Sequence, residues 1–197
     1  MWNERFSEPG FAYGTDPNDF LVEVAHTIPR GRVLCLAEGE GRNAAYLARL
    51  GYDVTAVDLS DVGREKAMAL ADERGVAVDY KLADLATFDI QRGSWQAIVS
   101  IFCHLPPPAR AHLHARCVRG LAIGGVLVLE GFATRQLELG TGGPKSRELL
   151  YELDVLRGDF VGLELEIARE VERPLIEGAY HTGVASVVQI LGVKPLR

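Results

Sequence analysis

The sequence predicts an α/β fold in which helices cover both faces of a mostly parallel sheet. Three observations support this prediction. Apolar strand patterns alternate with amphipathic helix patterns between residues 33 and 131. The first strand pattern runs directly into a glycine turn that opens a helix. Two strand patterns near the end of the chain follow one another with only a loop between them, which indicates that the sheet ends in an antiparallel hairpin.

The elements follow one another in a regular order. The first helix pattern begins near Pro17, with Asp16 as its expected N-cap, and its apolar face continues to Ile28. After it we expect strands at 33–37, 53–58, 77–82, 96–102 and 125–131, and helices at 42–50, 60–74 and 107–119. Because helical crossovers join most of these strands, the strands are expected to be parallel and doubly wound.

The last quarter of the chain has a different pattern. Apolar residues between Leu163 and Val171 alternate with glutamates, as in a half-exposed edge strand. Residues 185–193 are apolar on both faces, so we expect this strand to lie between the edge strand and the strand at 125–131. The glycine-rich loop 140–146 precedes the hairpin, and either a lid or a tolerated surface insertion is compatible with it.

Composition excludes several classes of protein. The 197 residues suit one buried domain, 1–197, and leave little room for a second. Lys and Arg number 21 against 27 Asp and Glu, giving a net charge of −6 with no basic cluster, which argues against a nucleic-acid partner. No apolar run approaches the roughly 20 residues of a membrane span. The 3 cysteines are irregularly spaced, which favours reduced thiols in a cytoplasmic protein and predicts no metal site.

The glycine turn within residues 33–43, VLCLAEGEGRN, predicts a nucleotide site. Gly39 and Gly41 lack a Cβ, so the backbone can turn tightly and a ligand can approach it closely. Asp58 ends the next predicted strand, where its carboxylate can accept hydrogen bonds from both hydroxyls of a ribose. Together these residues predict a cofactor that contains adenosine.

The charge of the turn distinguishes between cofactors. Gly39, Gly41 and Ala44 also match the G-x-G-x-x-G/A pattern of NAD(P) sites. However, Glu38 and Glu40 would repel a diphosphate, whereas the sulfonium and ammonium groups of S-adenosylmethionine would be attracted. The alternative is that both glutamates are solvated acids of a surface loop. The turn therefore favours S-adenosylmethionine, with S-adenosylhomocysteine as the product.

These segments together resemble the class I S-adenosylmethionine-dependent methyltransferases over nearly the whole chain. LCLAEGEGR is similar to the family's first motif, LDLGCGxGR, and AVDLS, LADL and IVSIFCHLP are similar to the second, third and fourth. The resemblance implies a Rossmann-like sheet of seven strands in the order 3-2-1-4-5-7-6. It also implies cofactor contacts from Glu38, Gly39, Glu40, Gly41, Asn43, Asp58, Leu59, Asp84, Leu85 and Ser100.

The first motif departs from the family pattern at three positions. Cys35 stands where the family has an acidic residue. Ala37 and Glu38 stand where the family often has glycine and a small residue. We expect Glu38 to supply the charge that Cys35 lacks.

A narrower resemblance is to bacterial methyltransferases related to the tellurite-resistance and thiopurine enzymes. It rests on WNERF, YGTDPNDFL, FCHLP and EGAYHTG. It implies that the N-terminal segment 1–30 covers the cofactor, with Tyr13 near the sulfonium, where an aromatic face attracts a cation. The wider group methylates sulfur, selenium or tellurium centres. The modest insertions suit a small acceptor, and a thiol, a selenium or tellurium oxyanion and a phenolic compound are all compatible with a cleft of this kind.

Two histidines are candidates for acid–base chemistry or for orienting the acceptor. His104 follows the fourth strand, where the chain leaves the sheet, and the alternative is a structural histidine that caps Pro106 and its helix. Tyr180 and His181 precede the last strand and could reach the same cleft, or they could be ordinary loop residues. Cys103 could be reactive, or it could be a small buried residue.

Two other functions remain open at this point. An NAD(P)-linked oxidoreductase shares the glycine turn and Asp58, but it needs room for a substrate domain and a less acidic loop. A non-catalytic domain that binds S-adenosylmethionine shares the whole cofactor site. The FCHLP segment supplies candidate catalytic polar groups and therefore favours an enzyme. Both a monomer and a homodimer remain open.

Overall fold

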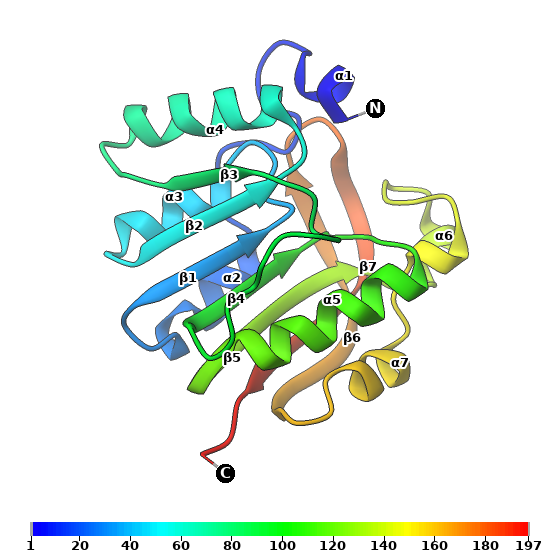
Figure 1. Ribbon diagram of the computed structural model, residues 1–197. Coiled ribbons are helices and arrows are strands. Elements are labelled where there is room, and N and C mark those ends of the chain that lie inside the picture. Colours follow the sequence, from blue (N-terminus) through cyan, green and yellow to red (C-terminus); the bar gives the residue numbers. More distant parts are fainter. Residues whose placement is uncertain (1, 197) are drawn as a thin grey trace.

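The computed structural model describes residues 2–196, so the predicted domain limits 1 and 197 lie outside the described residues. A seven-stranded sheet in the order β3-β2-β1-β4-β5-β7-β6 forms its centre (Figure 1), which confirms the predicted fold class. The strands are β1 (Arg32–Leu36), β2 (Asp53–Asp58), β3 (Asp79–Leu82), β4 (Trp95–Ile101), β5 (Leu121–Phe132), β6 (Glu164–Glu177) and β7 (His181–Val193). The first five pair in parallel, and β7 runs antiparallel to both β5 and β6.

Helices cover both faces of the sheet (Figure 1). Residues of α2, α3 and α4 pack with one buried cluster, and residues of α5 and α7 pack with the other. The helices are α1 (Trp2–Phe6), α2 (Asp19–Val24), α3 (Arg42–Arg49), α4 (Asp61–Glu73), α5 (Pro107–Gly120), α6 (Gln136–Leu139) and α7 (Leu153–Asp159), with 3₁₀ turns at Ala25–Thr27 and Arg147–Leu149. The sequence did not predict α1, α6 and α7, which span at most 7 residues and are too short to show helical periodicity.

The start of α2 differs from the prediction. Its N-cap is Asn18, whose side-chain oxygen accepts a hydrogen bond from the backbone N–H of Leu21 at 3.1 Å. The prediction of Asp16 as N-cap and Pro17 as the first helical residue is therefore wrong. The Asn18 amide also donates to the buried carboxylate of Glu130 at 2.7 Å, a contact between segments far apart that fixes the cap.

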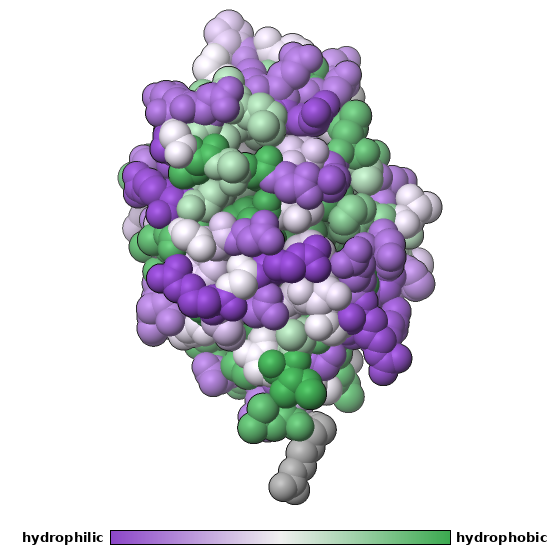
Figure 2. All heavy atoms as spheres, turned by 60° about the vertical axis from the view of Figure 1, so that its left-hand side comes forward, coloured by the Kyte–Doolittle hydropathy of each residue, from purple (hydrophilic) through white to green (hydrophobic). Residues whose placement is uncertain are grey.

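The surface carries mixed charge. Figure 2 shows hydrophilic side chains spread over one face of the molecule, with apolar residues in smaller groups between them. Within residues 2–196, no helix is both long enough and apolar enough to cross a membrane.

The carboxyl ends of the parallel strands meet at one edge of the sheet. Ligands of open α/β sheets bind at such an edge, because the loops that follow the strands converge there. The N-terminal helix α1 and the turn between β6 and β7 lie over the same edge (Figure 1), and the hydroxyl of Tyr180 in that turn donates to Glu8 at 2.5 Å. Segments from both ends of the chain therefore enclose this edge.

Candidate active site

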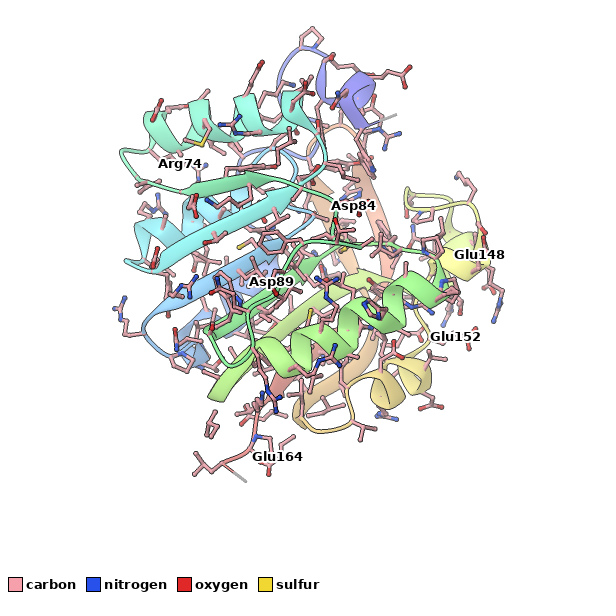
Figure 3. The ribbon with its side chains drawn as sticks, in the orientation of Figure 1. Arg74, Asp84, Asp89, Glu148, Glu152 and Glu164 are labelled. Atoms are coloured by element: carbon pink, nitrogen blue, oxygen red, sulfur yellow. The ribbon has the colours of Figure 1, made fainter. Side chains whose placement is uncertain are left out.

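A cavity of about 690 Å³ opens at the carboxyl edge of the sheet. Every predicted cofactor residue lines it except Gly41 and Ser100. The described residues around it come from segments 2–14, 37–43, 58–59, 84–85, 101–105, 132, 142–149 and 180–181. Asp84, which follows β3, lies at this edge (Figure 3). The turns after four strands, the end of β5 and three further segments therefore share one cavity.

The two predicted residues outside the cavity wall have packing roles. A Cβ added to Gly41 would lie 2.5 Å from the Cβ of Ala67, so this glycine lets α3 approach α4. Ser100 is 3% exposed within β4.

The glycine turn after β1 is held by hydrogen bonds to its backbone. Gly39 has φ of 58°, and its N–H donates to the Asp58 carboxylate at 3.0 Å. The hydroxyl of Tyr80 donates to the Gly39 carbonyl at 2.6 Å. A Cβ on Gly39 would lie 3.0 Å from the Phe6 ring, so the N-terminal segment closes directly over the turn.

Asp58 ends β2 with its carboxylate facing the turn. One oxygen accepts from Gly39 N–H, and the other accepts from Ser60 N–H at 2.8 Å. Burial raises the pKa of Asp58, although these backbone hydrogen bonds oppose the increase. The side chain thus ties the first two strand ends together and lines the cavity.

Glu38 lies inside the first motif and is 8% exposed. Its carboxylate accepts from the N–H of Ala44 at 2.7 Å, in the first turn of α3. Burial raises the pKa of Glu38 to about 7, although this hydrogen bond and the Arg42 charge oppose the increase. The alternative of a solvated loop acid is therefore wrong for Glu38.

Glu40 is 4% exposed, so the solvated alternative is wrong for this residue as well. One carboxylate oxygen accepts from the N–H of Ala12 at 2.8 Å, and the other pairs with Lys66 at 3.0 Å. Lys66 also donates to two carbonyls of the N-terminal segment, those of Glu8 and Gly10. Glu40 therefore fastens that segment to the glycine turn, a role that its position in the motif did not indicate.

Two non-glycine residues at the cavity have left-handed backbone conformations. Ala37, after β1, has φ of 49°, and Phe102, after β4, has φ of 52°. Such conformations cost free energy for a residue with a Cβ and occur often at functional sites. At Ala37 the positive φ explains why the related motif has glycine.

His104 lines the cavity, but both of its ring nitrogens have protein partners. Nδ1 lies 2.8 Å from the Leu149 carbonyl, and Nε2 accepts from the N–H of Phe132 at 3.2 Å. Burial lowers the pKa of His104 to about 4, so the ring is neutral near pH 7. It bonds these two segments instead of capping the helix after Pro106. The neighbouring Cys103 is buried, and burial raises the pKa of its thiol to about 12, which disfavours the reactive thiolate.

Aromatic side chains form the other half of the cavity. The His181 ring lies 4.5 Å from Tyr13, 4.7 Å from Phe102 and 5.2 Å from Phe132, measured between ring centroids. The Arg5 guanidinium donates to the Tyr13 hydroxyl at 2.9 Å and lies over the Tyr180 ring. The sequence did not single out Arg5, Phe102 or Phe132, although Phe102 belongs to the FCHLP segment.

His181 contacts a cluster of buried charged and amide side chains through Glu177. We call this cluster the carboxylate network, and its members are Asn18, Arg42, Glu130, Arg173, Glu177 and Gln189. Glu130 is 0% exposed and accepts from Arg173 at 2.6 Å and from Gln189 at 2.6 Å. Glu177 accepts from Arg42 at 2.6 Å and from Nδ1 of His181 at 3.3 Å. The network joins the N-terminal segment, α3, β5, β6 and β7, and sequence analysis missed it because its members are far apart in the chain.

The geometry agrees with comparisons to known proteins. Residues 33–125 match a family model described as a methyltransferase domain. No curated protein matches the chain.

Many solved structures share the fold at low sequence identity. TehB from Haemophilus influenzae is 21% identical, with a TM-score of 0.75 over 90% of this chain and 62% of its own. A structure from work on the conversion of a disulfide bond into a thioacetal group during echinomycin biosynthesis is 20% identical, with a TM-score of 0.75 over 91% of this chain and 83% of its own. An S-adenosylmethionine-dependent methyltransferase from Methanosarcina mazei is 17% identical, with a TM-score of 0.70 over 92% of this chain and 100% of its own. Residues 33–125 are therefore similar to a methyltransferase domain, and the chain shares its fold with solved S-adenosylmethionine-dependent methyltransferases.

Proposed function

We propose that the chain transfers the methyl group of S-adenosylmethionine to a small-molecule acceptor, using a single domain over residues 1–197. The observation that carries this proposal is the division of one cavity into an acidic half at the glycine turn and an aromatic half beside it. The cofactor supplies an electrophilic methyl group. The protein's task is to align the acceptor with that group and to exclude water, because an in-line displacement depends mainly on positioning.

The acidic half suits the chemistry of this cofactor. Gly39 leaves space in the turn that a Cβ would fill against the Phe6 ring, and Gly41 lets α3 approach α4 behind it. The carboxylates of Glu38 and Asp58 face a cavity that would take a cationic ligand with ribose hydroxyls. We assign Asp58 to the ribose and Glu38, with Asn43, to the amino-acid end. Asp84, Leu85 and the 62% exposed Leu59 would flank the adenine.

The N-terminal segment 1–30 would cover the bound cofactor. Ala12 is fastened to Glu40, and the backbone N–H of Asn18 donates to the side chain of Asn43 at 2.9 Å. Tyr13 lines the cavity between the acidic and aromatic halves, where its ring could attract the sulfonium. These contacts support a role for the N-terminal segment as a cover that contacts both the acidic and the aromatic half of the cavity.

The acceptor would lie against the aromatic half. The subgroup resemblance is to enzymes that methylate sulfur, selenium or tellurium, and a cleft of this kind is also compatible with a phenolic acceptor. A thiolate would need positioning but no base. We assign His104 a structural role in this half, since both of its ring nitrogens are engaged.

Calorimetric titration tests the cofactor assignment. We expect S-adenosylmethionine and S-adenosylhomocysteine to bind at micromolar concentrations and NADPH not to bind. Asp58→Ala should weaken both adenosyl ligands at least about 100-fold, because it removes charge-assisted hydrogen bonds worth roughly 1.5–3 kcal/mol each. Asp53→Ala, on the exposed start of the same strand, is the matched control. Unchanged affinity in Asp58→Ala would contradict the assignment.

Variants of Tyr13 test whether its ring contacts the sulfonium of the bound cofactor. We expect Tyr13→Ala to weaken S-adenosylmethionine more than the neutral thioether S-adenosylhomocysteine, because only the former carries the sulfonium. Tyr13→Phe should retain most of the difference. Equal losses for the two ligands would place Tyr13 away from the sulfonium. Formation of S-adenosylhomocysteine on addition of an acceptor then distinguishes an enzyme from a domain that only binds the cofactor.

A further inference from the structure

We propose that the acceptor is an aromatic hydroxyl compound whose proton is accepted by Nε2 of His181, and that Glu177 positions His181 for this step. These assignments rest on the proposed methyl transfer and narrow its acceptor. Glu177 acts through His181 and is therefore a positioning residue.

The geometry of His181 differs from that of His104. Nδ1 of His181 faces the Glu177 carboxylate at 3.3 Å, so this nitrogen carries the ring proton of the neutral imidazole. Nε2 then holds a lone pair, and it has no hydrogen-bond partner within the described part of the chain. The side chain is 8% exposed and lines the cavity. In His104, by contrast, a backbone N–H occupies the Nε2 lone pair.

Glu177 is held rigidly as a carboxylate. One oxygen accepts from Arg42 at 2.6 Å, and the other accepts from Asn18 at 3.1 Å and Arg173 at 3.2 Å. Burial raises the pKa of Glu177, but His181 and Arg42 more than offset this effect and lower it to about 2. A carboxylate held in this way fixes the orientation of the imidazole and stabilises the imidazolium that forms when Nε2 takes a proton.

Burial, reinforced by two arginines, favours the neutral form of His181 before the reaction. Burial lowers the pKa of His181, and the Glu177 carboxylate opposes this effect, while the charges of Arg42 and Arg173 reinforce it. Tyr13 and Phe102 contact the ring from the N-terminal segment and from the end of β4. A neutral imidazole with a free lone pair is the form that a general base requires.

The side chains around the His181 ring favour an aromatic acceptor. Tyr13, Phe102 and Phe132 surround the His181 ring, and aromatic faces pack well against a planar ring. Among these three side chains a small oxyanion would lose its hydration without gaining equivalent hydrogen bonds, since the cationic Arg5 and Lys145 line other parts of the cavity. The wall beside His181 therefore favours a planar aromatic ring over a selenium or tellurium oxyanion.

The presence of a base favours a hydroxyl over a thiol. A phenolic hydroxyl with a pKa near 10 is protonated at pH 7, whereas a thiol ionises far more readily. In the proposed step the acceptor O–H bond breaks and its proton moves to Nε2. The oxygen electron pair forms the new bond to the methyl carbon, while the pair of the breaking S–C bond remains on sulfur. His181 then releases the proton to solvent.

Matched acceptors test the proposal. We would measure the formation of S-adenosylhomocysteine with a panel of substituted phenols, including 4-methylphenol, and with the corresponding benzenethiols. Glu177→Gln and His181→Gln should lower kcat for the phenols at least about 30-fold, consistent with loss of a general base, and change the thiol rates less than about 3-fold. His112→Gln, at an exposed position on α5, is the matched control and should change neither rate.

A second readout is independent of turnover. In ¹⁵N NMR spectra of the ligand-free protein, we expect His181 to be protonated at Nδ1 and not at Nε2. Glu177→Gln should produce a mixture of the two tautomers, whereas a purely structural Glu177 would leave the tautomer unchanged. His181→Gln keeps Glu177 paired with Arg42, Arg173 and Asn18, so if Glu177→Gln does not fold, this variant still tests the base through the phenol and thiol rates.

The outcomes that contradict the proposal are distinct from a failure of the proposed function. Equal losses with phenols and thiols would overturn the role of His181 as a base. Methylation of thiols but of no phenol by the wild type, or binding of S-adenosylhomocysteine without methylation of any phenol, would overturn the acceptor class. Failure to bind either adenosyl ligand would instead contradict the proposed function itself.

Discussion

The two halves of the cavity are built in different ways. The acidic half consists of the turns after β1, β2 and β3, and its central hydrogen bonds join Gly39, Asp58 and Ser60, which lie close in sequence. The aromatic half brings together the N-terminal segment, the ends of β4 and β5 and the β6–β7 hairpin. Asn18 and Glu177, which help to hold it, are 159 positions apart. Backbone geometry shapes the first half, and buried charge pairs hold the second.

The largest expected effect comes from breaking the carboxylate network. Arg173→Met leaves the carboxylate of Glu130 buried without its main cation and also removes a partner of Glu177. We expect the free energy of unfolding to fall by about 3–5 kcal/mol, because an uncompensated buried charge is costly. Urea unfolding monitored by circular dichroism measures this change.

An exposed arginine that pairs with the same strand provides the control. Arg135 pairs with Glu172 on β6 at 3.0 Å, and both side chains are substantially exposed. Arg135→Met should therefore cost less than about 1 kcal/mol. Similar losses for the two variants would show that the network does not hold the aromatic half.

His104 should make the aromatic half sensitive to acid. Its pKa of about 4 lies below the usual value of 6.5, so the unfolded state binds the proton more readily. The contribution of His104 is fully present above pH 6.5 and is lost as the pH falls through about 4, an effect of about 2–3 kcal/mol. Comparing urea unfolding of wild type and His104→Gln between pH 7 and pH 4 measures it. Parallel pH profiles for the two proteins would contradict this prediction.

Glu38 should make the stability of the folded protein depend on pH in the opposite direction. Its pKa of about 7 lies above the usual value of 4.5, so the folded state holds the proton more tightly. Its contribution is fully present below pH 4.5 and is lost as the pH rises through about 7, by about 2–3 kcal/mol.

The isosteric variant Glu38→Gln isolates this effect. Gln can still accept the hydrogen bond from Ala44 N–H but carries no ionisable group. We expect its stability relative to wild type to increase between pH 5 and pH 8 in urea unfolding. A constant difference across that range would show that Glu38 is ionised throughout.

The smallest effect concerns backbone strain in the acidic half. Ala37 has φ of 49°, which glycine adopts without the steric cost that a Cβ imposes. Ala37→Gly should stabilise the folded protein by about 1 kcal/mol, partly offset by the greater freedom of glycine in the unfolded chain. The melting temperature should rise by a few degrees, and Ala45→Gly within α3 should lower it.

The two halves of the cavity also differ in how much of each could be predicted from the sequence. The strand order follows from alternating patterns, and the glycine turn with Asp58 was identified because its parts are contiguous or one strand apart. The contact of Asn18 with Glu130, the tether of Glu40 to Ala12 and the pairing of Glu177 with Arg42 depend on segments that meet only in the folded protein. His104 was noticed for its position, but the backbone groups that occupy its nitrogens could not be read from neighbouring residues.

The position of β7 between β5 and the edge strand β6 has a consequence for synthesis on the ribosome. This strand is made after β1 to β6, yet it must insert between β5 and β6, and Gln189 on it donates to Glu130. A nascent chain that has emerged only through β5 can form the parallel strands and the glycine turn, but β5 still lacks a neighbour on one side and Glu130 still lacks two of its partners. The acidic half can thus take shape early during translation, whereas the aromatic half is completed only after β7 has left the exit tunnel.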